Sequence, residues 1–378
     1  MKTRSAKPHW VVLLAVVVAL AAALAAAGCG GGEEPAQEAG GQPATETEAP
    51  PATETEAPPP TTEAETEAEA APEPASLRVA LDWFPNPDHV SLYYALENGH
   101  WADQGLDIEL KTPSDPSAGL KLVASGQFDL AIYYSADTYF AAEQGVPVVA
   151  VASLVPVPLN SLISLADSKV TGPETIQGAK IGVAGLPFDD AVLKTIRDSQ
   201  GLSEDDVQAV NVGFNLEPAL LSKKVDAVIG AYFNIEATSI EIKTEAAPNV
   251  ISMESLGVPT YDELLVVANK ERIESDPAFA DAVSRFIAGM KLGVEGAQAD
   301  EAGSIQLMKD NTDYSAEEID GMVPDTLALL TPPDGRVTTC FDLDNWQALG
   351  DWMVEKDLLK EPIDATTVAT NDYNPNGC

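Results

Sequence analysis

The sequence predicts an α/β protein whose body, residues 77–378, forms two lobes with a cleft between them. Three observations support this fold class. Apolar runs bounded by turn residues alternate with segments of helical periodicity. The body holds about 300 residues, which is more than one hydrophobic core usually organises. Two proline-containing stretches, "SLVPVPLN" and "LGVPTYDE", interrupt the alternation and suit stiff crossovers between lobes.

The alternation places strands and helices in order along the body. Strands are expected at 77–81, 107–110, 130–132, 148–153, 161–165, 180–183, 209–212, 227–230, 250–253 and 263–268. Helices are expected at 90–104, 116–125, 137–144, 189–200, 216–222, 277–298, 302–309, 315–322 and 343–356. Because strands and helices alternate, we expect parallel sheets with helices on both faces.

The two crossovers assign the body to two lobes. The first lobe takes residues 77–158, and the chain returns to it with residues 259–378, whose helices pack back on it. The second lobe takes residues 159–258. A chain that crosses twice in this way can move its lobes about the two connections.

The first 29 residues have the pattern of a secretory signal. Lys2, Arg4 and Lys7 precede an apolar run, 10–27, which ends in small residues and Cys29. Cys29 looks like the lipidated cysteine of a bacterial lipobox, which predicts a lipid anchor on the extracytoplasmic face of the cell membrane. The alternative is a plain transmembrane anchor, because the run is nearly long enough to span a bilayer.

Residues 30–76 are expected to be a disordered tether rich in Glu, Pro and Thr. The segment contains twelve Glu, no Lys or Arg and no aromatic residue. Such a segment cannot bury enough apolar area to offset its chain entropy, and its like charges and prolines extend it. We therefore expect it to hold the body away from a membrane.

The charge of the body excludes one class of partner. Three of the 21 basic residues lie in the leader and twelve of the 60 acidic residues in the tether, which leaves 18 basic against 48 acidic residues. A body this acidic repels polyanions, so nucleic acid is excluded as a partner.

The cysteines suggest one disulfide. If Cys29 carries lipid, Cys340 and Cys378 are the remaining pair, and a disulfide between them suits an exported protein. Two free thiols are the alternative.

Four loops follow expected strands and should meet at the cleft, because ligands of open α/β sheets bind beyond the carboxyl ends of the strands. They are residues 82–89, 133–137, 185–190 and 232–236, two from each lobe. They hold aromatic, amide and carboxylate side chains but no Lys or Arg. Small anions are usually held by Arg or by a helix N-terminus, and the only such terminus here is followed at once by Asp189 and Asp190. The composition instead favours a flat, neutral or weakly basic heterocycle that carries an amine.

The candidate ligand-binding residues in these loops are Trp83, Asn86, His89, Tyr133, Asp137, Pro187, Phe188, Tyr232, Asn234 and Glu236. Several have structural alternatives. His89 could cap a helix or pack in the core, and Glu236 lies near a helix start, where the helix dipole favours a carboxylate in any case. Tyr133 and Tyr134 alternate at a strand end, so we expect one of them in the cleft and the other in the core.

Signatures of catalysis are missing from the sequence. It contains no Gly-x-Ser-x-Gly elbow, no phosphate-binding loop and no zinc-protease pattern, and scattered acids show no glycosidase-like spacing. The mature body has two His, so a transition-metal site is not expected. We expect no enzyme activity, metal or cofactor.

Four stretches resemble the THI5/NMT1-like family when taken in order: "LDWFPNPDHVSLYYALENGHWADQGLDIELK", "SGQFDLAIYYSAD", "IQGAKIGVAGLP" and "VDAVIGAYFNIEA". Within the family they look most like ThiY-type substrate-binding lipoproteins of ABC importers for thiamine-pyrimidine precursors. The resemblance implies a type II periplasmic-binding-protein fold and an aminopyrimidine ligand of the formylaminopyrimidine or hydroxymethylpyrimidine type. It implies stacking by Trp83 and Tyr232, with Asn86, Asn234 and Glu236 on the polar edges of the ring.

The family also contains pyrimidine synthases, and the chain departs from their pattern. Where those enzymes use a lysine and a histidine, this chain aligns Tyr133 and Asp137, so no Schiff base can form. The resemblance implies a monomer that delivers its ligand to an ABC permease and its ATPase. A riboflavin-like heteroaromatic or a sulfonate- or nitrate-type anion remains the alternative ligand.

Overall fold

The computed structural model describes residues 73–375 and 377–378. The predicted leader 1–29, with Cys29, and the predicted tether as far as residue 72 lie outside the described residues. Strand β1 (Ala75–Ala80) begins inside the range predicted for the tether. The folded body therefore starts two residues before the expected position 77.

The first sheet combines four strands from before the first crossover with one strand from after the second. Its order is β2 (Leu106–Lys111), β1, β3 (Leu130–Tyr133), β10 (Leu264–Asn269) and β4 (Val148–Val155). β1 pairs in parallel with β2 and β3, whereas β10 lies antiparallel between β3 and β4. The chain thus leaves this sheet after β4 and re-enters it as β10.

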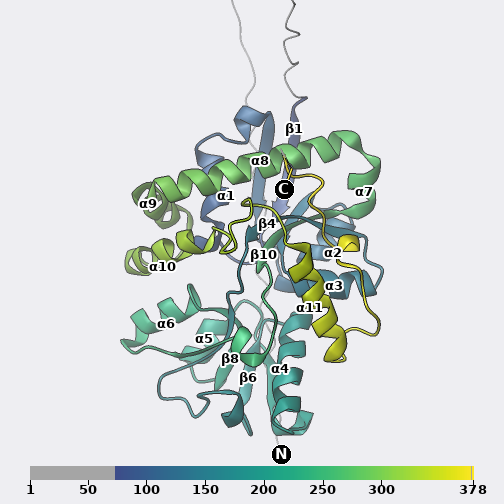
Figure 1. The fold of residues 1–378 in the computed structure, drawn as a ribbon. Helices are drawn as coiled ribbons and strands as arrows, with labels where there is room; N and C mark the ends of the chain where they lie inside the picture. Colours follow the sequence, from purple (N-terminus) through teal and green to yellow (C-terminus); the bar gives the residue numbers. More distant parts are fainter. Residues whose placement is uncertain (1–72, 376) are drawn as a thin grey trace, which may run out of the picture. The chain divides into compact units, whose positions relative to one another are not determined.

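The second sheet is built from the middle of the body. Its order is β7 (Gln208–Asn211), β6 (Lys180–Val183), β8 (Ala227–Tyr232), β5 (Asn160–Ser164) and β9 (Asn249–Ser252). β6 pairs in parallel with β7 and β8, and β5 lies antiparallel between β8 and β9. Figure 1 shows α4, α5 and α6 beside this sheet.

The prediction of parallel sheets is wrong, because both sheets are mixed. In each sheet the antiparallel strand is the one that follows a crossover: β5 after the first and β10 after the second. A strand buried on both faces reads as a continuous apolar run in either direction. The apolar pattern therefore located these strands but could not give their direction.

Eleven helices cover the sheets of the described body. They are α1 (Val90–Glu97), α2 (Gly119–Ala124), α3 (Ser135–Glu143), α4 (Pro187–Ser199), α5 (Leu216–Leu221), α6 (Glu236–Thr244), α7 (Lys270–Ser275), α8 (Pro277–Ala299), α9 (Glu301–Asn311), α10 (Ala316–Leu329) and α11 (Leu343–Glu355). The long helix α8 packs against α1 of the first lobe. Helix α10 contacts its neighbour α9 and also α6, which belongs to the second lobe.

Four helices differ from the prediction, and one of them, α6, forms where no helix was expected. The expected helix 90–104 ends at Glu97, because Gly99 adopts the left-handed conformation (φ +73°) and redirects the chain. Helix α10 runs past the expected end at residue 322 and carries Pro324 inside it. Helix α7 was not expected either, since a six-residue segment shows little periodicity.

The C-terminal segment is tied to the second crossover and to itself. Arg336 donates to the buried carboxylate of Asp262 at 2.9 Å and to the carbonyl of Cys340 at 3.0 Å. Cys340 and Cys378 form a disulfide with their Cα atoms 5.8 Å apart, the pairing expected from the sequence. In the described part of the chain, no helix is both long and apolar enough to cross a bilayer.

Candidate ligand-binding site

A cavity lies where the two sheets face each other, and both lobes contribute to its wall. Together with its opening to solvent it holds about 560 Å³ of space not filled by protein atoms. The lining residues are Asp82, Trp83, Asn86, Tyr134, Ser135, Ala136, Asp137, Asn160, Leu186, Phe188, Asp189, Gly230, Tyr232, Ile235, Glu236, Tyr261 and Glu263. None of these described lining residues is Lys or Arg.

The topology explains why these residues meet. The chain leaves β1 and β3 of the first sheet, and β6 and β8 of the second, at the edges that face the cavity. Trp83 and Asp137 follow the first pair of strands, and Phe188 and Glu236 follow the second pair. The carboxyl ends of parallel strands are the usual ligand-binding edge of such sheets.

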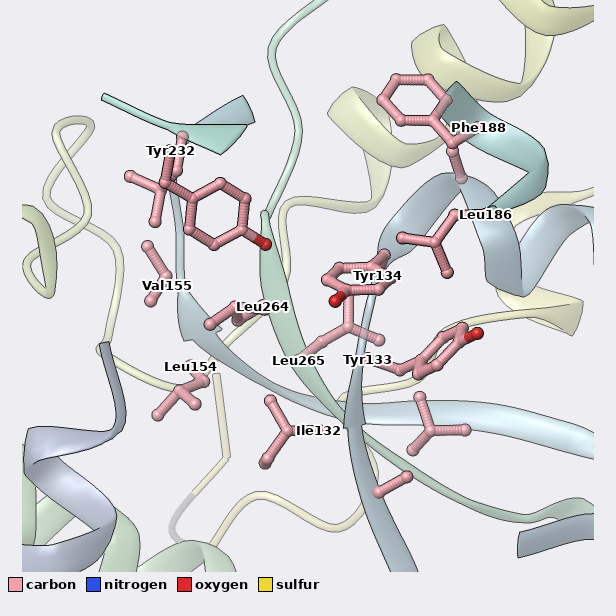
Figure 2. Packing of buried hydrophobic residues seen from close by; sticks show 14 of the residues in the cluster. Ile132, Tyr133, Tyr134, Leu154, Val155, Leu186, Phe188, Tyr232, Leu264 and Leu265 are labelled. Atoms are coloured by element: carbon pink, nitrogen blue, oxygen red, sulfur yellow. The ribbon is translucent and has the colours of Figure 1, made fainter. Parts of the chain in front are cut away.

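Aromatic rings form the apolar part of the wall. Half-buried Trp83 comes from the first lobe and Tyr232, 8% exposed, comes from the second. Figure 2 shows Tyr134 between Tyr232 and Leu186, among the apolar side chains that surround the ends of β3 and β10. Rings on several sides of a cavity suit a flat ligand, because aromatic pairs gain from stacked and edge-to-face contacts.

The carboxylate of Asp82 is held in place by neighbours on the first lobe. Its Oδ1 lies 2.8 Å from His89 Nε2, and its Oδ2 accepts from the hydroxyl of Tyr134 at 3.0 Å. The backbone N–H of Asn86 donates to Nδ1 of the same histidine, which leaves Nε2 as the donor toward Asp82. His89 therefore orients Asp82 and does not itself line the cavity.

Glu236 of the second lobe and Glu263 of the second crossover add two carboxyl groups to the cavity wall. Glu236 accepts the backbone N–H of Tyr232 at 2.8 Å. Glu263, on the second crossover, accepts the N–H groups of Leu159 and Asn160 on the first crossover, at 2.7 and 2.9 Å. Burial raises the pKa of both carboxyls to about 7, against the opposing effect of these hydrogen bonds.

Asp137 and Asp189 face the cavity from different lobes. Burial raises the pKa of Asp137 to about 7, although the nearby N–H of Phe188 acts to lower it. Burial, with a contribution from the charge of Asp137, raises the pKa of Asp189 well above its ordinary value. Burial therefore favours the protonated forms of Asp137, Asp189, Glu236 and Glu263 more than water does, unless a donor or a cation enters the cavity.

The structure brings six of the ten predicted residues to the cavity wall: Trp83, Asn86, Asp137, Phe188, Tyr232 and Glu236. Four lie outside it: His89, Pro187, Asn234 and Tyr133. His89 is fully buried behind Asp82, and Pro187 begins α4 and is exposed. Asn234 is buried and donates to Asp88 at 2.7 Å and to Thr326 at 2.9 Å, both on the first lobe. Ligand contact by these four remains a prediction that the geometry does not favour.

Tyr133 does not line the cavity, and the neighbouring Tyr134 lines it instead. The Tyr133 hydroxyl lies 3.4 Å from the carbonyl of Pro116, and its ring covers Gly119. Figure 2 shows this hydroxyl directed away from Tyr232. Alternation along the strand predicted that one tyrosine would face the cavity but could not say which one.

Several lining residues were not among the candidates. Asp82, Tyr134 and Asp189 lie in the predicted loops and could have been chosen from their position there. Asn160, Tyr261 and Glu263 lie at or before the beginnings of β5 and β10. Those strands are antiparallel to their neighbours, so it is their amino ends that face the cavity. A search of carboxyl ends could not find them.

Within residues 73–375 and 377–378, no group of three or more His, Cys, Asp or Glu side chains is arranged to hold a metal ion. The acids of the cavity are spread around its wall instead of converging on one point.

Two lobes of this topology with a cavity between them define a periplasmic-binding-protein fold. The structure is similar to that of the alkanesulfonate-binding protein SsuA from Xanthomonas axonopodis pv. citri, with a TM-score of 0.61 and 16% identity over 79% of this chain and 99% of that chain. The two-lobed fold predicted from the sequence is thus confirmed, apart from the strand directions.

The family follows from the sequence. A family model described as NMT1/THI5 like matches residues 86–302, and the chain belongs to this family. It is 31% identical over 292 residues to a formylaminopyrimidine-binding protein of Halalkalibacterium halodurans, covering 76% of this chain and 87% of that protein. It is 28% identical over 233 residues to the 4-amino-5-hydroxymethyl-2-methylpyrimidine phosphate synthase THI11 of Saccharomyces cerevisiae, covering 58% of this chain and 66% of that protein.

Proposed function

We propose that the protein is the extracytoplasmic solute-binding component of an ABC importer and captures an aminopyrimidine of the thiamine-precursor type between its lobes. One observation carries the proposal: the cavity combines aromatic rings with five carboxylates and has no Lys or Arg on its described wall. The relative named as a formylaminopyrimidine-binding protein supports the same ligand class.

An aminopyrimidine matches both halves of this wall. Its flat ring can lie against Trp83 and Tyr232, and each aromatic contact is worth about 1 kcal/mol beyond the area it buries. Its amino group donates hydrogen bonds to carboxylates, at about 1.5–3 kcal/mol for each charge-assisted bond. Micromolar capture needs about 8 kcal/mol in total, which these contacts and the accompanying burial can supply.

A small anion is a poor match for the same cavity. Sulfonate and nitrate need Arg, Lys or a free helix N-terminus. The N-terminus of α4 does reach the cavity, but its first turn carries Asp189 and Asp190. The similarity to an alkanesulfonate-binding protein concerns the fold, and it does not extend to the charge required of the site.

A synthase-like reaction is also disfavoured. A Schiff base needs a lysine amine in the cavity, and the described wall has none. The position where the synthases' lysine was expected holds Tyr133, whose hydroxyl faces Pro116. We therefore propose binding and release without chemical change.

Capture would proceed by closure of the lobes about the two crossovers. Several contacts join the lobes near the cavity, including Trp83 with Phe214 and Asn234 with Asp88. A ligand that touches both lobes favours the closed form, because its contacts are complete only there. The proposal also includes a lipid anchor at Cys29, a monomeric state, and delivery of the ligand to a permease and its ATPase.

Titration calorimetry with the full chain tests the proposal. The ligands are 4-amino-5-hydroxymethyl-2-methylpyrimidine, N-formyl-4-amino-5-aminomethyl-2-methylpyrimidine, riboflavin, taurine and nitrate. We expect micromolar or tighter binding of the aminopyrimidines alone, and their recovery unchanged by mass spectrometry after incubation. Binding of only riboflavin or the anions would contradict the ligand class, and conversion of a bound pyrimidine would contradict the transport role.

A further inference from the structure

Two acids approach the cavity from opposite lobes. Asp137 lies in the first turn of α3 and Asp189 in the first turn of α4. Both line the cavity and are almost fully buried, at 3% and 0% exposed. Closure therefore brings two carboxyl groups to one site whose described wall offers no cation.

These two acids keep buried hydrogen-bonding capacity that Asp82 has used. Asp137 Oδ1, Asp137 Oδ2 and Asp189 Oδ1 are buried and have no hydrogen-bond partner among the described residues. Oδ2 of Asp189 accepts the N–H of Ala184 at 2.9 Å, and the nearby N–H of Leu186 also acts to lower the pKa of this carboxyl. The carboxylate of Asp82, by contrast, has partners for both of its oxygens.

The backbone keeps the free oxygen of Asp189 in position. Gly230 lines the cavity with φ +96°, and a Cβ added there would lie 3.0 Å from Asp189 Oδ1. The missing side chain at Gly230 thus provides the space that this oxygen occupies beside the cavity. A buried acceptor without a partner costs free energy, and two facing carboxylates cost more unless a donor or a cation lies between them.

We propose that Asp137 and Asp189 form an amine subsite that accepts the two hydrogens of the amino group on a heteroaromatic ligand, one acid from each lobe. The inference rests on the proposed function, because it assigns a position to the ligand's amino group within the same cavity. An amine placed there joins the lobes directly. A ring without the amine leaves the two acids facing each other, so the subsite also determines specificity.

The raised pKa values of the two acids support this assignment. Burial raises the pKa of Asp137 to about 7 and that of Asp189 well above its ordinary value. The groups that face them are acidic or neutral: Glu263 near Asp137, Asp190 on the same helix as Asp189, and Tyr133 nearby. The backbone N–H groups of Phe188, Ala184 and Leu186 act to lower these pKa values but do not offset the burial, and no neighbouring cation of the described body does so. An amine on the ligand would supply the missing donor.

The test compares two probes that differ only in the amine: 4-amino-5-hydroxymethyl-2-methylpyrimidine and 5-hydroxymethyl-2-methylpyrimidine. Affinities are measured by calorimetry for the full chain and for Asp137→Asn, Asp189→Asn and the control Asp190→Asn. Asparagine keeps the volume of Asp and, at position 189, keeps an acceptor for Ala184. Asp190 is exposed and lies one residue from Asp189, which makes it a matched control.

We expect the native protein and Asp190→Asn to prefer the amino ligand by at least about 100-fold, the product of two charge-assisted hydrogen bonds. Asp137→Asn and Asp189→Asn should each reduce this preference about tenfold or more while binding the amine-free probe at least as well as the native protein. Equal losses for both probes, or an unchanged preference, would overturn the subsite. Binding of neither probe by the native protein would overturn the proposed function, and the subsite with it.

A crystal structure of the native protein with the amino ligand decides the question even if the variants fail to fold. We expect the amino nitrogen within hydrogen-bonding distance of both Asp137 and Asp189. An amino group directed to Glu236 or Glu263 instead would refute the inference and leave the proposed ligand class intact.

Discussion

Trp83 and Phe214 meet across the two lobes, with ring centroids 4.7 Å apart and ring planes at 78°. Trp83 follows β1 on the first lobe, and Phe214 precedes α5 on the second. Phe84 packs on the same phenylalanine ring, also at 4.7 Å. Trp83 lines the cavity and Phe214 does not. Phe214 of the second lobe therefore supports the indole ring of Trp83 from outside the cavity.

Phe214→Ala should therefore weaken ligand binding without touching the ligand. The edge-to-face contact is worth about 0.5–1.5 kcal/mol, which predicts a loss of affinity of about 2- to 10-fold, seen as faster dissociation in stopped-flow fluorescence. The control is Phe233→Ala, at a 37% exposed position away from the cavity, which should bind as the native protein does. Equal dissociation rates for Phe214→Ala and the native protein would show that the contact does not support closure.

Asn234 makes a second connection between the lobes. Its side-chain amide donates to Asp88 and to Thr326, and all three residues are buried. Asn234→Ala leaves the carboxylate of Asp88 unpaired in the closed form, which costs about 1–3 kcal/mol, or about 5- to 150-fold in affinity. Calorimetry measures the loss. Asn215→Ala, which removes an amide that bonds only within the second lobe, is the control and should change affinity less than twofold.

Thr326→Val separates the two bonds made by Asn234. It removes one acceptor and leaves the Asp88 contact, so the expected loss is smaller than for Asn234→Ala. A larger loss of affinity in Thr326→Val would mean that the bond to Thr326 on α10 contributes more to closure than the bond to Asp88.

The sequence predicted where the strands lie but not their directions. The unknown directions also explain why some residues of the site were missed. Each of the ten strands of the described body lies at a predicted apolar run, because turn residues bound every run. Direction depends on where the chain re-enters a sheet after a crossover, which no local pattern encodes. Glu263 and Asn160 were missed for this reason, since they precede or begin antiparallel strands.

The loops at the carboxyl ends were more informative. Their rings and acids identified Trp83, Asp137, Tyr232 and Glu236, all of which line the cavity. Sequence could not separate a residue that faces the cavity from one directly behind it. His89 is the example: a polar residue in the correct loop whose imidazole orients Asp82 from the core side.

Closure of the ligand-free protein should depend on pH. We expect opening of the lobes to expose the carboxyls of Asp137, Glu236 and Glu263 to water and to return their pKa values toward the ordinary range, whereas burial raises each to about 7 in the structure described. The closed form thus binds more protons between about pH 4.5 and 7. Closure is favoured below that range, and the preference is lost as the pH rises through about 7.

Small-angle scattering by the ligand-free full chain at pH 5.5 and 8.5 measures this effect, and we expect the more compact form at pH 5.5. The control is the triple variant Asp137→Asn, Glu236→Gln and Glu263→Gln, which should show a weaker dependence on pH than the native protein. Some dependence should remain, because the variant keeps Asp189, whose pKa is also raised by burial. The neighbouring charges of Glu217 and Asp82 also act on Glu236, in the same direction. A native protein equally compact at both pH values would contradict the prediction.

Glu263 joins the two crossovers, so two substitutions at this position should have different effects. One oxygen accepts the N–H groups of Leu159 and Asn160, while the other lies 3.5 Å from the hydroxyl of Tyr232. Glu263→Ala leaves two buried N–H groups without an acceptor, which should lower the free energy of unfolding by about 2–5 kcal/mol. Glu263→Gln keeps an acceptor for both N–H groups and removes only the charge, so it should unfold within about 1 kcal/mol of the native protein. Urea denaturation followed by circular dichroism compares the two variants, and equal destabilisation by both would show that the charge of Glu263, and not its link between the crossovers, is what the fold requires.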